Sequence, residues 1–433
     1  MAKLQLITNP PASRPRLLVL DSSFSLEAIR SRGLEHSVTC RDLDGFFDHV
    51  WTVHPFASLV TSNAWAEKYG SPNIYSLAPR HTFIDGKVGR FSALRWFPPL
   101  NFLIGQLGIF WFLLRLIRHQ GISLIRVGDP LYLGLFGWAL GRVCRLPLVV
   151  RVGANHDKTY ELTGRPLMRR LFLSRKFEKV AERFVFARAD LVAGANQDNL
   201  DFALANNAKS EFSTLFRYGN LIDRRHFVEP ATRGGGVALL HELGVGLQRF
   251  LLYVGRLEEI KHPDHVLRVL GILRRRGHDV RAVFAGDGAL SGRLRDLSRT
   301  LGVEDRTILC GNQAQQWLSQ ILPHAAAVIS PHTGRALSEA ALAAAPIVAY
   351  DVDWQSELVQ TGVTGELVPN LKWEEMAKAT ERFLADPDYA RTMGRAARRR
   401  ALEMLDPEAL DQHEREQYAA LLIRFAQRRG RPG

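Results

Sequence analysis

Two groups of residues in the second half of the chain have the composition of a phosphate-binding site. In the first group, Gly255 and Arg256 end an apolar stretch of strand length, and Lys261 follows shortly after. A glycine at a strand end lets the backbone approach a ligand, and an arginine binds phosphate oxygens through two N–H groups. Lys261 adds a point charge beside the same anion. These residues predict a diphosphate site, although two solvated surface cations fit the isolated motif equally well.

The second group follows the apolar stretch 326–330 and consists of a glycine turn and a helix expected over 336–344. The positive end of such a helix favours a bound anion. The backbone amides expected there are those of Thr333, Gly334, Arg335 and Ala336. Glu339 lies early in the helix, within reach of a ribose diol. Taken alone, the same helix also has a purely structural explanation, in which Glu339 complements the helix dipole and the alanines pack closely on a sheet.

Strand-length apolar stretches alternate with helical patterns along the chain, which predicts parallel sheets covered on both faces. The expected strands are 16–21, 49–54, 73–77, 124–127, 146–152, 190–194, 213–218, 250–255, 281–286, 307–311, 326–330, 346–351 and 365–368. Because the alternation occurs twice, we expect an α/β protein with two doubly wound domains.

The length of 433 residues also favours more than one domain. Glycines and a proline between the two alternations indicate a linker. The expected division is an N-terminal domain over 1–227, a linker over 228–249, a C-terminal domain over 250–390, and helices with a basic tail over 391–433.

The net charge of +13 predicts attraction to an anionic partner. The three cysteines form no Cys-x-x-Cys pair, which fits a reducing cytoplasm. No signal peptide is expected over 1–15, and the apolar stretch 102–114 is too short to span a bilayer. No helix-turn-helix, zinc finger or RNA-binding signature is present, so nucleic acid is not expected as the partner.

A basic, amphipathic stretch over 165–188 offers one explanation of the charge. Arg169, Arg170 and Lys176 alternate there with aliphatic and aromatic residues. Such a pattern suits contact with anionic lipid. Together with the helix around 102–114, it could seat the first domain on a membrane. A helix packed on its sheet, with a solvated basic face, accounts for the same pattern.

Two further loops follow expected strands. Asn155 and His156 come after the strand 146–152, where a histidine is able to orient or protonate a substrate group. A loop histidine bonded locally explains the position as well. Asn312 follows the strand 307–311 and is expected to help shape the pocket for a nucleotide base.

As an ordered set, the motifs of residues 249–386 resemble those of a retaining, family-4-type glycosyltransferase. They are Val254-Gly255-Arg256-Leu257 with Lys261, Ala285-Gly286-Asp287-Gly288, Leu309-Cys310-Gly311, Glu339-Ala340 with Ala345-Pro346-Ile347-Val348-Ala349, and Glu357 to Val368. The resemblance implies the GT-B fold, in which two Rossmann-like domains face each other across a cleft and a C-terminal helix crosses back to the first domain.

The resemblance assigns Arg256 and Lys261 to the donor diphosphate, Thr333 and Gly334 to the β-phosphate, and Glu339 to the ribose. One departure concerns the first glutamate of the family's Glu-x7-Glu motif, since Pro331 occupies that position. His332 or Thr333 would replace it in contacting the transferred sugar.

The implied activity is transfer of a hexose from a nucleoside-diphosphate sugar to a cell-envelope glycan or a lipid-linked acceptor. No Asp-x-Asp suited to a metal ion is evident, and no cofactor is expected besides the co-substrate. The expected location is the cytoplasm, at the inner face of the membrane. A sugar-nucleotide epimerase, an inverting transferase on the same fold, and a non-catalytic GT-B scaffold remain alternatives.

Overall fold

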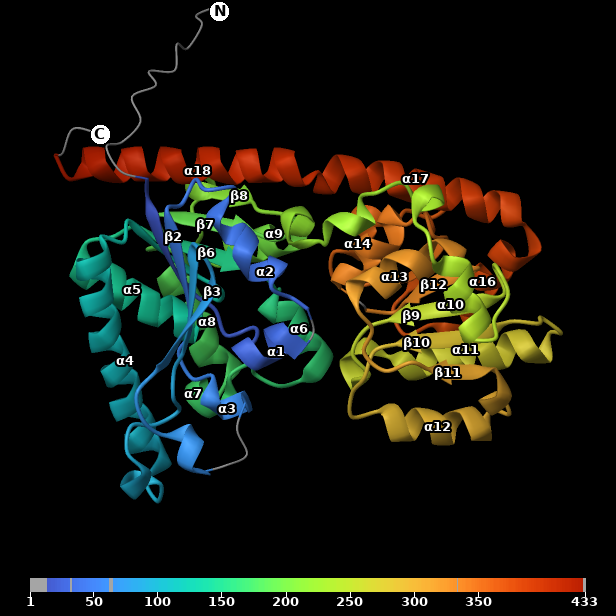
Figure 1. Cartoon of the computed structure of the whole chain (residues 1–433), viewed down its shortest axis with the longest axis horizontal. Helices are drawn as coiled ribbons and strands as arrows, with labels where there is room; N and C mark the ends of the chain where they lie inside the picture. Colours follow the sequence, from blue (N-terminus) through green and yellow to red (C-terminus); the bar gives the residue numbers. More distant parts are fainter. Residues whose placement is uncertain (1–13, 32, 62–64, 333, 431–433) are drawn as a thin grey trace, which may run out of the picture. The chain divides into compact units, whose positions relative to one another are not determined.

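The computed structural model consists of two compact α/β units (Figure 1). It describes residues 14–31, 33–61, 65–332 and 334–430. Unit 1 contains residues up to 216 and those from 408 onward, whereas unit 2 is the continuous segment 217–407. The first unit is thus built from both ends of the chain.

Unit 1 contains an eight-stranded sheet of order β3-β4-β2-β1-β5-β6-β7-β8. The strands are β1 (Arg16–Leu20), β2 (His49–His54), β3 (Asn73–Ala78), β4 (His81–Asp85), β5 (Leu124–Val127), β6 (Leu148–Val152), β7 (Leu191–Gly194) and β8 (Ser213–Leu215). All neighbours are parallel except β3, which pairs antiparallel with β4. The strand β4 is missing from the sequence prediction, which otherwise places these strands within a few residues.

Helices pack on both faces of this sheet, so that its central strands are buried on both sides, whereas the edge strands β3 and β8 are partly exposed. They are α1 (Leu26–Ser31), α2 (His36–Thr39), α3 (Ser58–Thr61), α4 (Pro98–Gln120), α5 (Tyr132–Cys144), α6 (His156–Thr163), α7 (Arg169–Phe172), α8 (Arg175–Phe186), α9 (Gln197–Ala205) and α18 (Pro407–Arg428). Continuous apolar strands such as β7 are what a parallel sheet with two covered faces requires.

Unit 2 contains a six-stranded, fully parallel sheet of order β11-β10-β9-β12-β13-β14. Its strands are β9 (Phe250–Val254), β10 (Arg281–Ala285), β11 (Thr307–Leu309), β12 (Ala327–Ser330), β13 (Ile347–Asp351) and β14 (Glu366–Pro369). Its helices are α10 (Gly236–Glu242), α11 (Pro263–Arg275), α12 (Ser291–Thr300), α13 (Gln315–Ile321), α14 (Arg335–Leu342), α15 (Gln355–Leu358), α16 (Trp373–Ala385) and α17 (Pro387–Leu405). The first three strands run outward from β9 to β11. The chain then returns to the centre of the sheet, where β12 pairs with the other side of β9. The carboxyl ends of β9 and β12 therefore adjoin at the position where doubly wound sheets bind ligands.

The segment 228–249 is not the linker that its glycines predict. It contains α10, whose Leu240 is buried in the core of unit 2. A Cβ at Gly236 would lie 2.2 Å from Nε2 of His324, so this glycine permits close packing. The boundary between the units instead falls after Phe216.

The C-terminal helices belong to different units. In α17, Gly394 packs so closely on the end of α14 that a Cβ would lie 2.1 Å from the carbonyl oxygen of Ala344. In α18, Tyr418 and Leu421 are buried in the core of unit 1. The expectation that the last helix returns to the first domain is thereby confirmed.

The helix α4 is longer than the apolar stretch 102–114 suggests. It spans 23 residues, and an 18-residue window has a mean hydropathy of 1.8, with 33% of that window buried. Among the described residues it is the one helix that is long and apolar enough to cross a membrane by length and composition. The helix therefore passes a test of length and composition that the shorter stretch 102–114 does not.

Candidate functional site

In unit 2, the backbone segments that follow β9 and β10 lie unusually close to each other. The amide of Gly255 donates to the carbonyl oxygen of Ala285 at 3.0 Å, and the amide of Leu257 donates to that of Asp287 at 3.0 Å. Gly286 has a φ of +152°, and a Cβ there would lie 1.9 Å from the carbonyl oxygen of Gly255. The glycine is thus required for the two strand ends to lie side by side.

The two predicted cations follow directly. Arg256 is exposed, and its Nη1 lies 2.8 Å from Oε1 of Glu258. Lys261 ends the short 3-10 helix Glu259–Lys261 and is partly buried. Burial lowers the pKa of Lys261, and the nearby Arg256 guanidinium lowers it further. The structure therefore brings the two cations into electrostatic contact, where a bound anion would relieve their repulsion.

His332 connects the loop of Lys261 with two other strand ends. Its Nδ1 lies 3.2 Å from the carbonyl oxygen of Ile260, and its Nε2 lies 3.4 Å from Oδ2 of Asp353. His332 follows β12 and Asp353 follows β13. Three carboxyl-end loops of the sheet are thus joined through one imidazole. Thr333, the neighbouring predicted contact, lies outside the described residues.

The helix α14 begins after Gly334, whose φ of +67° and ψ of −127° strongly favour glycine. At its other end, Arg398 donates to the carbonyl oxygens of Leu342 and Phe227, the latter at 3.0 Å. Arg233 also donates to Leu342, at 3.0 Å. Two guanidiniums thus stabilise the negative end of the helix, leaving its positive end directed at the rim of the sheet.

The remaining predicted donor contacts are placed differently. Glu339 is 3% exposed, with Oε1 3.5 Å from Nε of Arg335. The Arg335 side chain also donates to the carbonyl oxygen of Leu221 at 3.2 Å, so it holds the start of unit 2 against α14. Ala336 packs on the core, and Asn312 is exposed after β11. The side chains of Arg335 and Ala336 are therefore engaged within unit 2, and these two residues could contact a ligand only through their backbone atoms.

Gln355, which the sequence analysis missed, fixes the same rim from behind. Its Nε2 donates to the carbonyl oxygens of Pro331 at 3.1 Å and Tyr350 at 2.8 Å. Its Oε1 accepts from Oγ of Ser330 at 2.9 Å. A buried glutamine without a distinctive motif gives no signal in a single sequence.

In unit 1, Asn155 and His156 begin α6. The Asn155 side chain caps the helix by accepting from the amides of Asp157 and Lys158. His156 is 5% exposed, and its Nδ1 lies 2.8 Å from Oε1 of the buried Glu182. Asn155 therefore has a local role, whereas His156 is a buried, oriented imidazole at the carboxyl end of β6.

The predicted basic helix over 165–188 is interrupted. It forms α7 and α8, with Leu173 between them at a φ of +60°. Arg169, Arg170 and Lys176 are exposed, as a surface contact requires. Arg175 instead binds Asp157 at 2.8 Å and Glu182 at 2.6 Å, so part of the expected cationic face is neutralised within the fold.

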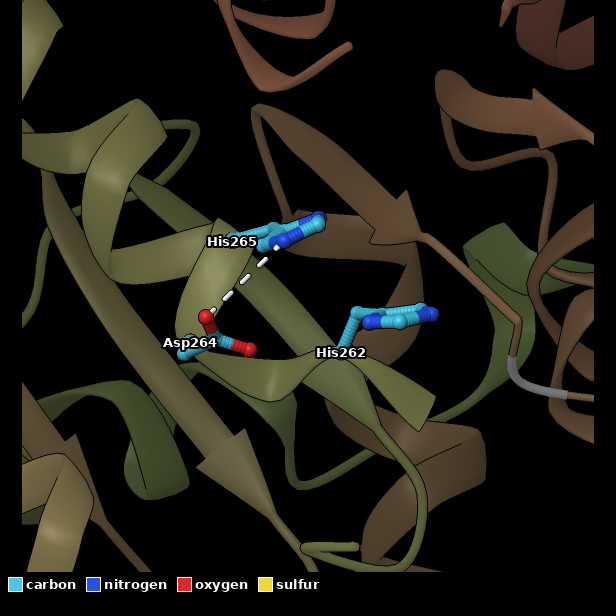
Figure 2. Close-up of side chains that lie close together, drawn as sticks. All are labelled: His262, Asp264 and His265. Carbon is cyan, nitrogen blue, oxygen red and sulfur yellow. Dashed lines mark ion pairs between the residues drawn. The ribbon is translucent and has the colours of Figure 1, made fainter. Parts of the chain in front are cut away.

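A further group, His262, Asp264 and His265, lies directly after Lys261 (Figure 2). Its possible ligand atoms lie within 4.8 Å of one another. However, the two imidazoles are stacked at 4.8 Å with an interplanar angle of 16°, so their nitrogens do not converge on one point. Nδ1 of His265 lies 2.8 Å from the hydroxyl of Tyr350, which anchors α11 to β13. The geometry is that of a packing cluster.

Part of the chain is similar to known proteins. Residues 245–400 match the family of glycosyl transferases group 1. The chain is 27% identical over 266 residues to alpha-D-kanosaminyltransferase from Streptomyces kanamyceticus, covering 60% of this chain and 67% of that protein. It is 29% identical over 234 residues to D-inositol 3-phosphate glycosyltransferase from Nocardia farcinica, covering 50% of this chain and 49% of that protein.

The whole chain also resembles solved structures. Anabaena Alr3699/HepE in complex with UDP superposes with a TM-score of 0.69 at 19% identity, covering 94% of this chain and 100% of that one. Sucrose-phosphate synthase from Thermosynechococcus elongatus gives 0.73 at 18% identity, covering 94% and 99%. The two parallel-sheet units therefore form the GT-B fold, and the chain is a glycosyltransferase whose residues 245–400 carry the group 1 domain.

Proposed function

We propose that the protein transfers a hexose from a nucleoside-diphosphate sugar to a hydroxyl group of a glycan or lipid-linked acceptor. The observation that carries the proposal is the pairing of Arg256 with Lys261 at the end of β9, where burial and mutual repulsion already lower the pKa of the lysine. Glu258 and Asp353 offset this repulsion only in part, since the pKa of Lys261 stays lowered, and a polyanion would stabilise the two like charges further. A diphosphate supplies that charge.

The same residues supply the chemistry. When the bond between the anomeric carbon and the diphosphate breaks, negative charge develops on the β-phosphate and the sugar acquires oxocarbenium character. Arg256, Lys261 and the amides at the start of α14 are fixed before the reaction, so they stabilise this charge without reorganising. No metal ion or cofactor is needed for this step, and we propose that none is used.

The donor is proposed to be a UDP-hexose. Two similar structures contain UDP with glucose and UDP-glucose. Glu339 is the residue proposed for the ribose hydroxyls, since its buried carboxylate lies one turn after the start of α14 and near Arg335. Retention of the anomeric configuration is proposed from the resemblance of the motifs. In that case, the departing phosphate assists deprotonation of the acceptor.

We further propose that the acceptor belongs to the cell envelope and that the enzyme works at the inner face of the membrane. The support is the net charge of +13 and the exposed Arg169, Arg170 and Lys176. Cations near an anionic surface each contribute about 1 kcal/mol to binding, and salt screens them. Neutralising these three residues is expected to weaken binding to anionic vesicles at low salt.

The decisive experiment combines donor binding with product analysis. UDP-hexoses are expected to raise the thermal stability of the native protein, and Arg256→Ala to abolish that shift. Arg293→Ala serves as control, because Arg293 is an exposed arginine of the same unit, with Nη1 3.0 Å from Oε1 of the exposed Glu259. Reaction products are identified by NMR with a panel of acceptors, with and without EDTA.

Each alternative predicts a different product. Epimerised nucleotide sugar would indicate the epimerase, and an inverted anomeric linkage would indicate the inverting transferase. If neither glycoside nor epimer forms and the donor does not bind, the non-catalytic scaffold is correct. Loss of activity with EDTA, restored by a divalent cation, would contradict metal independence.

A further inference from the structure

The helix α4 carries a solvent-exposed apolar face that the site in unit 2 does not use. The side chains on this face are 50–62% exposed, and we define it as the α4 face: Leu100, Leu103, Leu107 and Trp111. Their spacing of three, four and four residues places them in one line along the helix. Trp96 and Phe97, which precede the helix, extend the surface and are 75% and 64% exposed. Contiguous exposed apolar surfaces of this kind mark interaction sites.

The exposure of this face is enforced by the opposite side of the helix. Ile109, Leu113 and Ile117 are buried in the core of unit 1. Gln106 accepts from the hydroxyl of Tyr132 at 2.6 Å, and it donates to the carbonyl oxygen of Pro55 at 3.3 Å. The helix therefore cannot rotate its exposed side inward without breaking the core.

The segment before the helix is fixed as well. Asn101 is buried, and its Oδ1 accepts from the amides of Arg90 at 2.8 Å and Phe91 at 3.0 Å. Its Nδ2 donates to the carbonyl oxygen of Phe91 at 2.7 Å. The aromatic residues at the start of α4 are thus presented on a rigid end of unit 1, which Figure 1 shows reaching beyond the strands.

The segment that carries this face contains cations and no carboxylate. From Gly86 to Gly128 the sequence contains no aspartate or glutamate. It contains the cations Lys87, Arg90, Arg95, Arg115, Arg118 and Arg126, of which Arg126 is buried beside Glu414 in the core of unit 1 and takes no part in the surface. Arg115 and Arg118 are exposed and continue the line of the α4 face, and the guanidinium of Arg95 lies 5.0 Å from the centre of the Trp96 ring. Apolar and aromatic side chains bordered by cations complement the headgroup region of an anionic bilayer.

We propose that the α4 face, with Trp96 and Phe97, inserts into the interfacial region of an anionic lipid bilayer and anchors unit 1 there. The inference rests on the proposed membrane location. It assigns the contact to α4 and to apolar insertion, whereas the basic side chains of α7 and α8 would act by electrostatic attraction. The helix lies on the membrane and does not cross it, because its buried half is held in the core by the contacts of Gln106 and Ile117. Burial of apolar side chains supplies the binding energy, and the surrounding cations orient the surface.

The test uses the full chain and sedimentation with vesicles made of equal parts phosphatidylglycerol and phosphatidylcholine. The native protein is expected to bind, and most of the binding to persist at high salt, because insertion is not screened. Leu107→Gln combined with Trp111→Gln should weaken binding about tenfold or more. The control is Val237→Gln combined with Ile423→Gln, since these side chains are equally exposed at 66% and 52% on other helices.

Two additional measurements separate the possible outcomes. Brominated lipids should quench tryptophan fluorescence in the native protein, and Trp96→Phe should reduce that quenching. Thermal stabilisation by UDP must be unchanged in the double variant, which distinguishes loss of anchoring from failure of the donor site.

Three results would overturn the proposal. The first is absence of vesicle binding. The second is binding that is lost at high salt, is insensitive to the double variant and depends on Arg169, Arg170 and Lys176. The third is a concentration-dependent dimer that the double variant dissociates, which would show that a second copy covers the face.

Discussion

Gly286 lies against the backbone of Gly255, at a distance where a methyl group would be 1.9 Å from the carbonyl oxygen. No side-chain movement relieves this overlap, because the blocking atom belongs to the backbone. The end of β10 can therefore support the loop of Arg256 and Lys261 only while residue 286 is glycine. The geometry of the proposed donor site thus depends on a residue that has no functional side chain.

We predict that Gly286→Ala lowers the free energy of unfolding by about 3 kcal/mol, through overlap and an unfavourable φ. Denaturant unfolding measures the change. Gly292→Ala is the control, because a Cβ at Gly292 meets no atom within 4 Å. Equal stabilities of the two variants would contradict the close approach of the strand ends.

Lys261→Ala is predicted to lower kcat about 100-fold with little change in stability, since its ammonium group stabilises charge that develops in the transition state. Initial rates of glycoside formation test this. Lys378→Ala serves as control, because Lys378 is an exposed lysine that pairs with Glu375 on the surface of α16. An unchanged kcat for Lys261→Ala would exclude the lysine from the reaction.

Glu339→Gln is predicted to weaken UDP binding about tenfold, because a charge-assisted hydrogen bond to the ribose becomes a neutral one. Titration calorimetry measures the Kd. Glu375→Gln, on the exposed side of α16, should leave it unchanged. If UDP binds the Glu339 variant normally, the carboxylate serves only to pair with Arg335.

The pH dependence of stability should contain a contribution from His265. Burial lowers its pKa from 6.5 to about 4, and the nearby Asp264 offsets this only in part. Between these values the unfolded chain binds a proton that the folded chain does not, so the free energy of unfolding falls as the pH drops from 6.5 towards 4. His265→Gln should flatten the profile in this window and leave it unchanged above. Identical profiles for both proteins would contradict the neutral, buried state.

Arg398→Ala is predicted to destabilise unit 2 by about 3 kcal/mol, because two buried carbonyl oxygens lose a charged donor. Thermal unfolding reports this change. Arg399→Ala, at the next position on α17, is the control. If the two variants are equally stable, Arg398 does not fix the end of α14.

Much of the architecture could be predicted because buried parallel strands are continuous apolar stretches. The strand β4 escaped because His81 and Asp85 frame it with polar side chains and it forms a short hairpin with β3. The linker was misplaced because glycine serves close packing as well as flexibility, and Gly236 does the former. Composition does not distinguish the two uses.

The site followed the same pattern. Arg256 and Lys261 could be predicted as candidates because they follow the end of a recognisable strand. The pairing of Arg175 with Asp157 could not be predicted, because contacts between separate segments leave no trace in one sequence. The local capping role of Asn155 was missed for a related reason, since an N-cap and a ligand contact use the same side chain.

The late return of the chain to unit 1 determines the order in which the domains are completed during synthesis. Glu414 lies 3.9 Å from Nη1 of Arg126 and 3.6 Å from Nη1 of Arg151, deep in the core of unit 1. Until α18 leaves the ribosome, those guanidiniums lack their carboxylate, whereas every residue of unit 2 has already been translated. The second domain is therefore able to fold first, and the first domain is completed only once α18 has been synthesised.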